Sequence, residues 1–161
     1  MAEEINATQE EGVTPEFRMQ KMYVKDFSFE NPNAPKIFVT PQKTEPHVEL
    51  NLKMNNKKLD DDHFEVVLEI SAKVSTKEDE PTVLFILEIE HAAVFMVKNI
   101  PDEHMPMVLA VDCPTLLFPF TRQLVSQASV DGGFVPFQME PINFLALFQN
   151  AQKKKAEQKS N

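Results

Sequence analysis

The chain has 161 residues, 42% of them apolar, a formal net charge of -9 and a single cysteine. This length and apolar content suit one domain around a single core. An acidic chain repels phosphate backbones, which argues against nucleic acid and favours a basic protein partner, although acidity can also serve solubility alone. We find no run of about 18 apolar residues that would span a membrane, and no basic start or apolar stretch of a signal peptide. We therefore expect a cytoplasmic protein, with which the lone Cys113 agrees.

The two ends of the chain are polar. Residues 1–14 are charged and aperiodic, which predicts a disordered acidic arm. Residues 152–161 are rich in lysine and predict a flexible tail. We therefore expect the folded domain to occupy residues 15–151.

Four segments before Pro101 have the patterns of strands. Residues 47–55 and 64–74 alternate strictly, which is typical of half-buried strands. In residues 17–29, five apolar or aromatic side chains share one parity, but Met22 and Val24 lie on the other. Residues 83–97 are apolar on both faces at each end. Either another subunit covers the second face, which we favour, or a β-bulge switches the parity.

Two helices are expected after the strands. Pro114 suits a first helical turn. Leu116, Phe120, Leu124 and Ala128 then form an apolar stripe, flanked by Leu117 and Val125, that ends at Gly132 and Gly133. Asn143 suits an N-cap before a second stripe formed by Phe144, Leu147, Phe148 and Ala151. Strands followed by helices predict an α+β fold, with an antiparallel meander or Greek-key sheet.

The sequence contains little that suggests catalysis. Its three glycines, at positions 12, 132 and 133, cannot form a phosphate-binding loop, and its four histidines are scattered singly. Cys113 beside Pro114 is more typical of a small packed residue than of a nucleophile. Glu88 and Glu90 share a strand face, which suits a solvated acidic patch better than acid-base chemistry. We therefore expect that the protein is not an enzyme and that it has no catalytic residue, no cofactor and no metal site.

Phenylalanine is abundant and lies in unusual places. The chain has 13 Phe and no Trp, and several Phe lie beside prolines rather than inside periodic segments. Phe27 and Phe29 precede the loop NPNAP at 31–35, Phe38 follows it, and FVPFQMEPINF occupies 134–144. Such loops either bind apolar chains with little shape selectivity or cap the open end of the core. The residues alone leave both readings open.

Four motifs occur in order between residues 17 and 150. They are Tyr23-x-Lys25-Asp26-x-Ser28-Phe29-Glu30-x-Pro32-Asn33-Ala34-Pro35, then Phe64-Glu65-Val66-Val67-Leu68, then Cys113-Pro114-x-x-Leu117-Phe118-Pro119-Phe120-x-Arg122, then Pro141-x-Asn143-Phe144-x-Ala146-Leu147-Phe148. Together they resemble the bacterial protein-export chaperone family SecB. The resemblance implies a four-stranded antiparallel sheet backed by two helices. It also implies a homotetramer, a dimer of dimers with the long helices packed between two eight-stranded sheets.

The resemblance further implies an ATP-independent holdase. Such a chaperone binds unfolded precursor proteins and delivers them to the export motor ATPase SecA, without inserting into the membrane itself. The groove for these clients is expected to be lined by Phe27, Phe29, Pro32, Pro35, Ile37, Phe38, Phe137, Phe144, Leu147 and Phe148. The positions that match the SecA-docking surface are Asp26, Glu30, Ile86 and Glu88.

The chain departs from the family pattern at several places. Ala92 and Ala93 stand where the family commonly has two glycines, and Thr121 and Gln123 flank Arg122 where Ala and Glu are usual. The lysine-rich tail leaves open whether the tail contacts SecA. Two alternatives stay open: a SecB-like chaperone associated with a toxin-antitoxin pair, and a small-molecule-binding or enzymatic α+β domain. A holdase should bind long unfolded chains of unrelated sequence, whereas a closed pocket should not.

Overall fold

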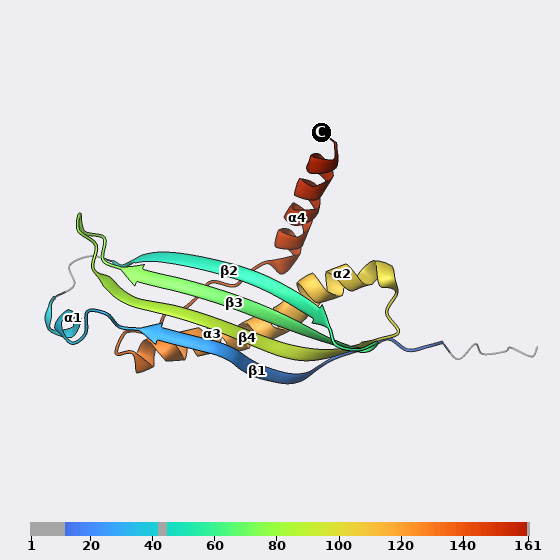
Figure 1. Cartoon of the computed structure of the whole chain (residues 1–161), viewed down its shortest axis with the longest axis horizontal. Coiled ribbons are helices and arrows are strands. Elements are labelled where there is room, and N and C mark those ends of the chain that lie inside the picture. The colour runs from blue at the N-terminus through green and yellow to red at the C-terminus, as the bar shows by residue number, and fades with distance from the viewer. Residues whose placement is uncertain (1–11, 42–44, 161) are drawn as a thin grey trace, which may run out of the picture.

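A computed structural model describes residues 12–41 and 45–160 of the chain. Its four strands are β1 (Glu16–Glu30), β2 (His47–Lys58), β3 (His63–Ser75) and β4 (Val83–Lys98), and a short helix α1 (Lys36–Val39) follows β1. The strands form one antiparallel sheet in the order β1-β4-β3-β2, shown in Figure 1. Strands β2 to β4 are sequential neighbours, and β1 lies beside β4. This is the Greek-key alternative of the two sheet topologies expected.

A continuous helical stretch follows the sheet. It comprises η1 (Asp102–His104), α2 (Met105–Met107), a π-helical turn η2 (Val108–Asp112) and α3 (Cys113–Asp131). The helical conformation therefore begins earlier than Pro114. By length and composition this stretch, Asp102–Asp131, could cross a membrane, a criterion that the core helix of a globular domain also meets. Here α3 packs against the sheet through contacts with β3 and β4.

The core lies between α3 and one face of the sheet. The even-numbered residues of β3 that the alternation predicted to be inside are buried: Phe64, Val66, Leu68, Ile70 and Val74. They face the same side as the odd-numbered residues of β4, such as Leu87 and Phe95. Three elements of the fold, β3, β4 and α3, thus supply most of the buried apolar surface.

The helix face predicted to be inside was partly wrong. Leu116 and Phe120 are 44% and 41% exposed, whereas the neighbouring row with Leu117, Thr121 and Val125 is fully buried. The error has a physical reason. A fully apolar row looked like the core face, but the true inner row contains a threonine whose hydroxyl is paired inside the protein.

Strand β1 contains two bulges. Within the described register, Gln20 and Lys25 have no partner on β4, because the pairing shifts between Met19 and Lys21 and between Val24 and Asp26. Each extra residue switches the parity of the side chains that follow it. Met22 pairs with Ala93 and Val24 with His91, so both face the helices together with Phe17 and Phe27. For β1, therefore, the bulge explains the apolar residues of both parities, and our preferred reading, a second covered face, was wrong.

The last helix, α4 (Phe144–Lys159), projects away from the sheet (Figure 1). Its predicted N-cap is confirmed, because the Asn143 side chain accepts a hydrogen bond from the Ala146 amide at 3.0 Å. The helix does not stop at 151. Of the residues expected to form a tail, 152–161, those up to Lys159 are helical, and residues 152–160 are exposed. At the other end, residues 1–11 of the expected arm lie outside the described residues.

One histidine is buried between the sheet and α3. The His91 side chain is 3% exposed, and its Nδ1 lies 2.7 Å from Oγ1 of Thr121. The Thr121 hydroxyl also donates to the Leu117 carbonyl at 3.3 Å, so Nδ1 of His91 is the donor toward Thr121. Burial lowers the pKa of His91 below its usual range. His91 is therefore a neutral, hydrogen-bonded core residue at neutral pH.

This burial predicts a loss of stability in mild acid. Above about pH 6.5 the histidine is neutral in both states; as the pH falls, the unfolded chain binds the proton first. The free energy of unfolding should then fall by up to about 1.4 kcal/mol per pH unit from this group. Denaturant titrations between neutral pH and mild acid should show this decline in the parent and not in His91→Gln, with His47→Gln on exposed β2 as the control. An equal pH slope in His91→Gln would contradict the assignment.

Candidate functional site

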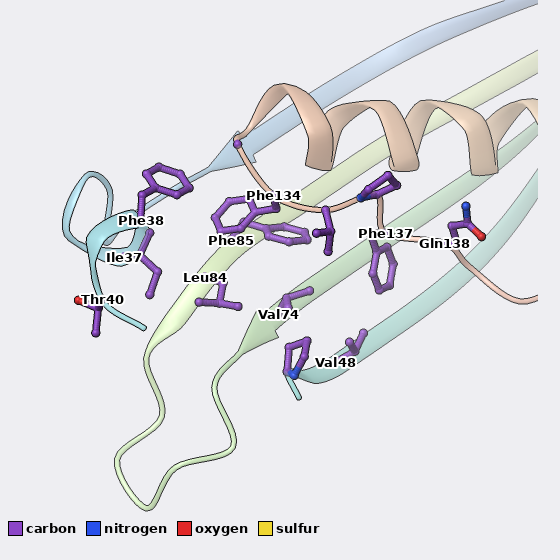
Figure 2. Close-up of a pocket in the computed structure, with 14 residues that line it drawn as sticks. Ile37, Phe38, Thr40, Val48, Val74, Leu84, Phe85, Phe134, Phe137 and Gln138 are labelled. Carbon is purple, nitrogen blue, oxygen red and sulfur yellow. The ribbon is translucent and has the colours of Figure 1, made fainter. Parts of the chain in front are cut away.

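An apolar pocket of about 550 Å³ lies at one end of the sheet. Figure 2 shows its walls, which come from α1, from the ends of β2, β3 and β4, and from the segment that follows α3. It is lined by Ile37, Phe38, Thr40, Pro46, Val48, Val74, Leu84, Phe85, Gly133, Phe134, Val135, Pro136, Phe137 and Gln138. Among the described residues that line it, only Thr40 and Gln138 carry polar side chains. The pocket can therefore bury apolar groups but offers few groups that would select one shape.

Aromatic rings form the inner wall of the pocket. The Phe85 ring on β4 lies 5.0 Å from the Phe134 ring and 6.4 Å from the Phe137 ring, measured between centroids. Phe29 stacks on the same Phe85 ring at 5.4 Å, and Phe38 lies 5.3 Å from Phe134. Such spacings are favourable for aromatic pairs. Phe85 is buried in the sheet, so it offers the rings of Phe29, Phe134 and Phe137 a fixed surface to pack against.

The NPNAP loop is tied to the rest of the fold by asparagines. The Asn31 side chain donates to the Gly132 carbonyl at 2.9 Å, and the Asn33 side chain donates to the Val83 carbonyl at 2.8 Å. Ile37 of α1 is buried at the base of the pocket. The loop thus bridges the end of α3 and the start of β4, and it fixes the position of Phe38 at the pocket mouth.

Two glycines at the end of α3 make room for the rings. The Phe29 ring lies against Gly132, and a Cβ at Gly133 would lie 2.8 Å from Cζ of Phe38. Gly133 also has a φ of 92°, which side chains rarely adopt. These two glycines, which sequence analysis interpreted only as a helix end, therefore seat the aromatic side chains of the β1–α1 segment.

The structure brings together only part of the expected groove. Ile37, Phe38 and Phe137 line the pocket, and Phe29 adjoins it through Phe85. Phe27 faces the helix side of the sheet, half exposed and outside the pocket. Pro32 and Pro35 are exposed in the loop and do not line it.

The three expected groove residues of α4 lie elsewhere. Phe144 is buried in the core, where its ring meets Phe118 edge-on at 5.8 Å. Leu147 and Phe148 follow on the helix that projects from the sheet, and they do not line the pocket. The sequence pattern gave their apolar character but not the direction of the helix. Phe144 thus anchors α4 to α3 rather than lining the pocket.

Several residues that line the pocket are absent from the predicted groove. Phe134, Val135 and Pro136 belong to the segment whose phenylalanines and prolines had been noted, so the signal was present. Phe85, Leu84, Val74 and Val48 had been interpreted as ordinary strand residues. The alternation of a strand does not indicate which of its apolar residues border a cavity.

The opposite face of the sheet carries charges of both signs, and part of it is acidic. The register aligns Asp26, Glu90 and Glu69 directly across three neighbouring strands, with Lys53 next on β2. In the following rows Ser28 pairs with Glu88, and Glu30 pairs with Ile86. The four expected docking residues, Asp26, Glu30, Ile86 and Glu88, therefore share this face.

A hollow of about 430 Å³ follows the acidic row, and Asp26, Glu69, Glu88, Glu90 and Lys53 are among the residues that line it. Like charges directly opposite each other on neighbouring strands are destabilising. Glu69 and Glu90 were absent from the expected docking set. The alternation of Glu88 and Glu90 could have indicated Glu90, but only the strand register shows that Glu69 joins them. We call Asp26, Glu30, Glu69, Glu88 and Glu90 the acidic face.

Two kinds of group that could support chemistry are sets of metal ligands and the thiol of Cys113. In residues 12–41 and 45–160 no three His, Cys, Asp or Glu side chains are placed to hold a metal ion. The Cys113 thiol is fully buried, and burial raises its pKa to about 12, with Asp112 adding to the effect. A thiol in this state is a poor nucleophile near neutral pH.

Comparisons with known proteins agree on one family. A family model described as "Preprotein translocase subunit SecB" matches residues 10–155. The chain is 68% identical over 147 residues to the protein-export protein SecB of Desulfotalea psychrophila, covering 91% of this chain and 93% of that protein. It is 47% identical over 144 residues to the protein-export protein SecB of Magnetococcus marinus, covering 89% of each.

The fold also resembles a solved structure. This is the Mycobacterium tuberculosis SecB-like chaperone in complex with a peptide from the HigA1 antitoxin, with a TM-score of 0.64. The two chains are 15% identical, and the match covers 78% of this chain and 90% of that one. At this identity the likeness concerns the fold alone.

Proposed function

The chain belongs to the SecB family of protein-export chaperones, and from that premise we propose that it is a holdase that binds unfolded precursor proteins in the cytoplasm without ATP. One observation carries the proposal at the level of this chain: the aromatic pocket is open at the surface. Phe38 and Val135 at its mouth are 49% and 82% exposed. Apolar groups exposed around a pocket indicate a binding site, since a residue that only caps the core would be buried. The pocket therefore favours the binding reading of the phenylalanine-rich loops.

The chemistry of the pocket suits clients without a fixed shape. Rings and aliphatic side chains gain free energy from any apolar side chain that they remove from water. An extended, unfolded segment can place such side chains in the pocket, whereas a folded protein has buried them. We propose that this apolar surface extends beyond the pocket to Phe27 and, on α4, to Leu145, Leu147 and Phe148.

We further propose that the acidic face docks a basic segment of the SecA motor. The cross-strand row of Asp26, Glu90 and Glu69 supports this, because a cationic partner would relieve the repulsion between the carboxylates. The face lies on the side of the sheet opposite to the pocket rings. A client and the motor would then occupy different surfaces of the same strands.

We propose a homotetramer, a dimer of dimers, as the assembly. Leu116, Phe120 and Val130 on the outer side of α3 are each more than 40% exposed, and β1 lies at the edge of the sheet. An apolar helix stripe and a free strand edge both suit contacts with further copies.

Assembly can be measured directly. Light scattering should give about four times the chain mass of 18.4 kDa at micromolar concentration. Charges on the outer helix stripe, in Leu116→Lys with Phe120→Lys, should dissociate the assembly, whereas Val39→Lys on α1 should not. A parent that stays monomeric would exclude the tetramer.

The pocket can be tested with two neighbouring residues of α1. Phe38→Ser should lower the affinity for a denatured, slow-folding protein by about tenfold, because it removes a ring from the pocket mouth. Val39→Ser should change it little, since Val39 is 82% exposed and does not line the pocket. The measurement is the concentration of chaperone that halves the rate of refolding, without nucleotide.

A core variant separates binding from stability in this test. Phe144→Ser should lower the melting temperature but leave binding per folded molecule unchanged, because Phe144 packs in the core. If Phe38→Ser instead lowers the melting temperature severely and binds clients normally, the phenylalanine-rich loops are caps of the core. A parent that never slows refolding would refute the holdase itself.

The acidic face can be tested with variants that reverse its charge. Asp26→Lys with Glu88→Lys should weaken binding to the motor strongly, and the parent's binding should weaken as salt is raised, because exposed charge pairs are screened. Client binding should stay nearly unchanged. Glu78→Lys with Glu103→Lys makes the same change of charge away from this face and serves as the control. Equal losses in both double variants would show that total charge, not the acidic face, governs the contact.

A further inference from the structure

The bulge at Lys25 decides which side of the sheet each residue at the end of β1 faces. Val24 pairs with His91 on the helix side, and the next pair is Asp26 with Glu90 on the acidic side. Lys25 is the extra residue between them. After it, Phe27 pairs with Ile89 and Phe29 with Leu87, so both rings face the helices. The bulge thus sets the side on which each of these residues lies.

One carboxylate holds the residues on both sides of Val24. The Tyr23 hydroxyl donates a hydrogen bond to Oε2 of Glu65, and Nζ of Lys25 lies 3.0 Å from Oε1 of the same side chain. Glu65 is on β3, whereas Tyr23 and Lys25 are on β1, and β4 lies between these strands. Both side chains therefore reach across β4. Ala92, which pairs with Tyr23 and is fully buried, offers the small side chain that this crossing needs.

The charges of the cluster suit both bonds near neutral pH. The hydrogen bond from Tyr23 lowers the pKa of Glu65, and the bond from Lys25 adds to this. Burial raises the pKa of Tyr23 to about 12, and Glu65 adds to the effect through their hydrogen bond. A carboxylate thus accepts from a neutral phenol and from a cation. Hydrogen bonds to ionised groups are stronger than neutral ones.

A slip of one residue would exchange the two faces. If the end of β1 moved to absorb Lys25 into the ladder, Asp26 would pair with Ile89, on the helix side. Phe27 would then lie opposite Glu88, on the acidic side. The pocket would lose the Phe29 ring from Phe85, and the acidic face would lose Asp26.

We propose that Tyr23, Lys25 and Glu65 are positioning residues that lock this bulge and so assign the aromatic side chains of β1 to one face and its carboxylates to the other. The value of that assignment rests on the proposed function, because it keeps the client and motor surfaces apart. The assignment of faces can be tested without either partner.

A cysteine in place of Ser28 can report which side of the sheet this residue faces. Ser28 pairs with Glu88 on the acidic face, two residues from both Asp26 and Glu30. A thiol there, in Ser28→Cys, should react faster with a cationic thiosulfonate reagent than with an anionic one of similar size, by on the order of tenfold. Cys113 is buried and should stay silent on this time scale. The ratio of the two rates therefore reports the side on which residue 28 lies.

Glu65→Ala should lower this ratio several-fold in the reporter chain. Glu49→Ala removes a carboxylate from the same face of the sheet at β2, far from the bulge, and should keep the ratio. Tyr23→Phe removes one of the two bonds and should give an intermediate ratio, so it decides the question if Glu65→Ala fails to fold. A ratio unchanged in both Glu65→Ala and Tyr23→Phe would overturn the proposal.

Deleting Lys25 can show whether Glu65 locks the bulge or only stabilises the sheet in general. Deleting Lys25 removes the extra residue, so that a regular ladder places Asp26 and Phe27 on their present faces. Combined with Glu65→Ala, this deletion should restore the high ratio. If the ratio stays low, the loss came from a loosened sheet, and the proposal is wrong. A parent with the high ratio that binds no unfolded protein would refute the proposed function and leave this inference standing.

Discussion

The alternation of side chains along β1 and β4 is the constraint on which the other features depend. Successive residues of a strand point to opposite faces, so the stretches 26–30 and 86–90 must serve both sides of the sheet at once. On one side they supply Phe29, Leu87 and Ile89 to the core and the pocket wall. On the other they supply Asp26, Glu30, Glu88 and Glu90 to the acidic face, which Glu69 of β3 completes. Neither surface can be changed by a shift of register without destroying the other.

The pocket is an extension of the core rather than a separate cavity. Phe85 is buried in the sheet and also contacts three aromatic rings that border the pocket. A rigid strand thus fixes the inner wall, while the exposed groups lie on α1 and on the segment after α3. Binding apolar ligands on such a site costs little ordering of the protein, because the wall is already packed. Gly132 and Gly133 make this possible, since side chains there would displace Phe29 and Phe38.

The sequence predicted the features that local patterns control. The strands 47–55 and 64–74, the N-cap at Asn143 and the order of sheet and helices were confirmed, because each depends on periodicity or on a single capping residue. The inner face of α3 was misjudged because Thr121 is polar yet paired with His91, a contact made across the fold. The bulges in β1 were not distinguished from a second covered face, since both produce apolar residues of both parities.

The candidate site could be predicted only in part for the same reason. Ile37, Phe38 and Phe137, which line the pocket, could be predicted because apolar residues are unusual in proline-containing loops. Phe85 looked like any core strand residue, and Phe144 looked like any residue of a groove helix. Glu69 could not be joined to Asp26 and Glu90 without the register of three strands. Periodicity predicts which residues of a helix or strand share one face, but tertiary structure determines which residues that face contacts.

The separation of the two surfaces limits how a client could be handed on. The pocket rings and the acidic face lie on opposite sides of one sheet, so both ligands fit at the same time, and a basic segment on the acidic face cannot displace a client by taking its place. Coupling between them can pass through β1, β3 and β4, whose side chains reach both sides. The bulge at Lys25 lies directly before Asp26, and two side-chain bonds to Glu65, one from Tyr23 and one from Lys25, cross the sheet beside it. A basic partner that binds Asp26 would act on the residue that directly follows the bulge, and Phe27 and Phe29, which face the other side, belong to the same stretch of strand.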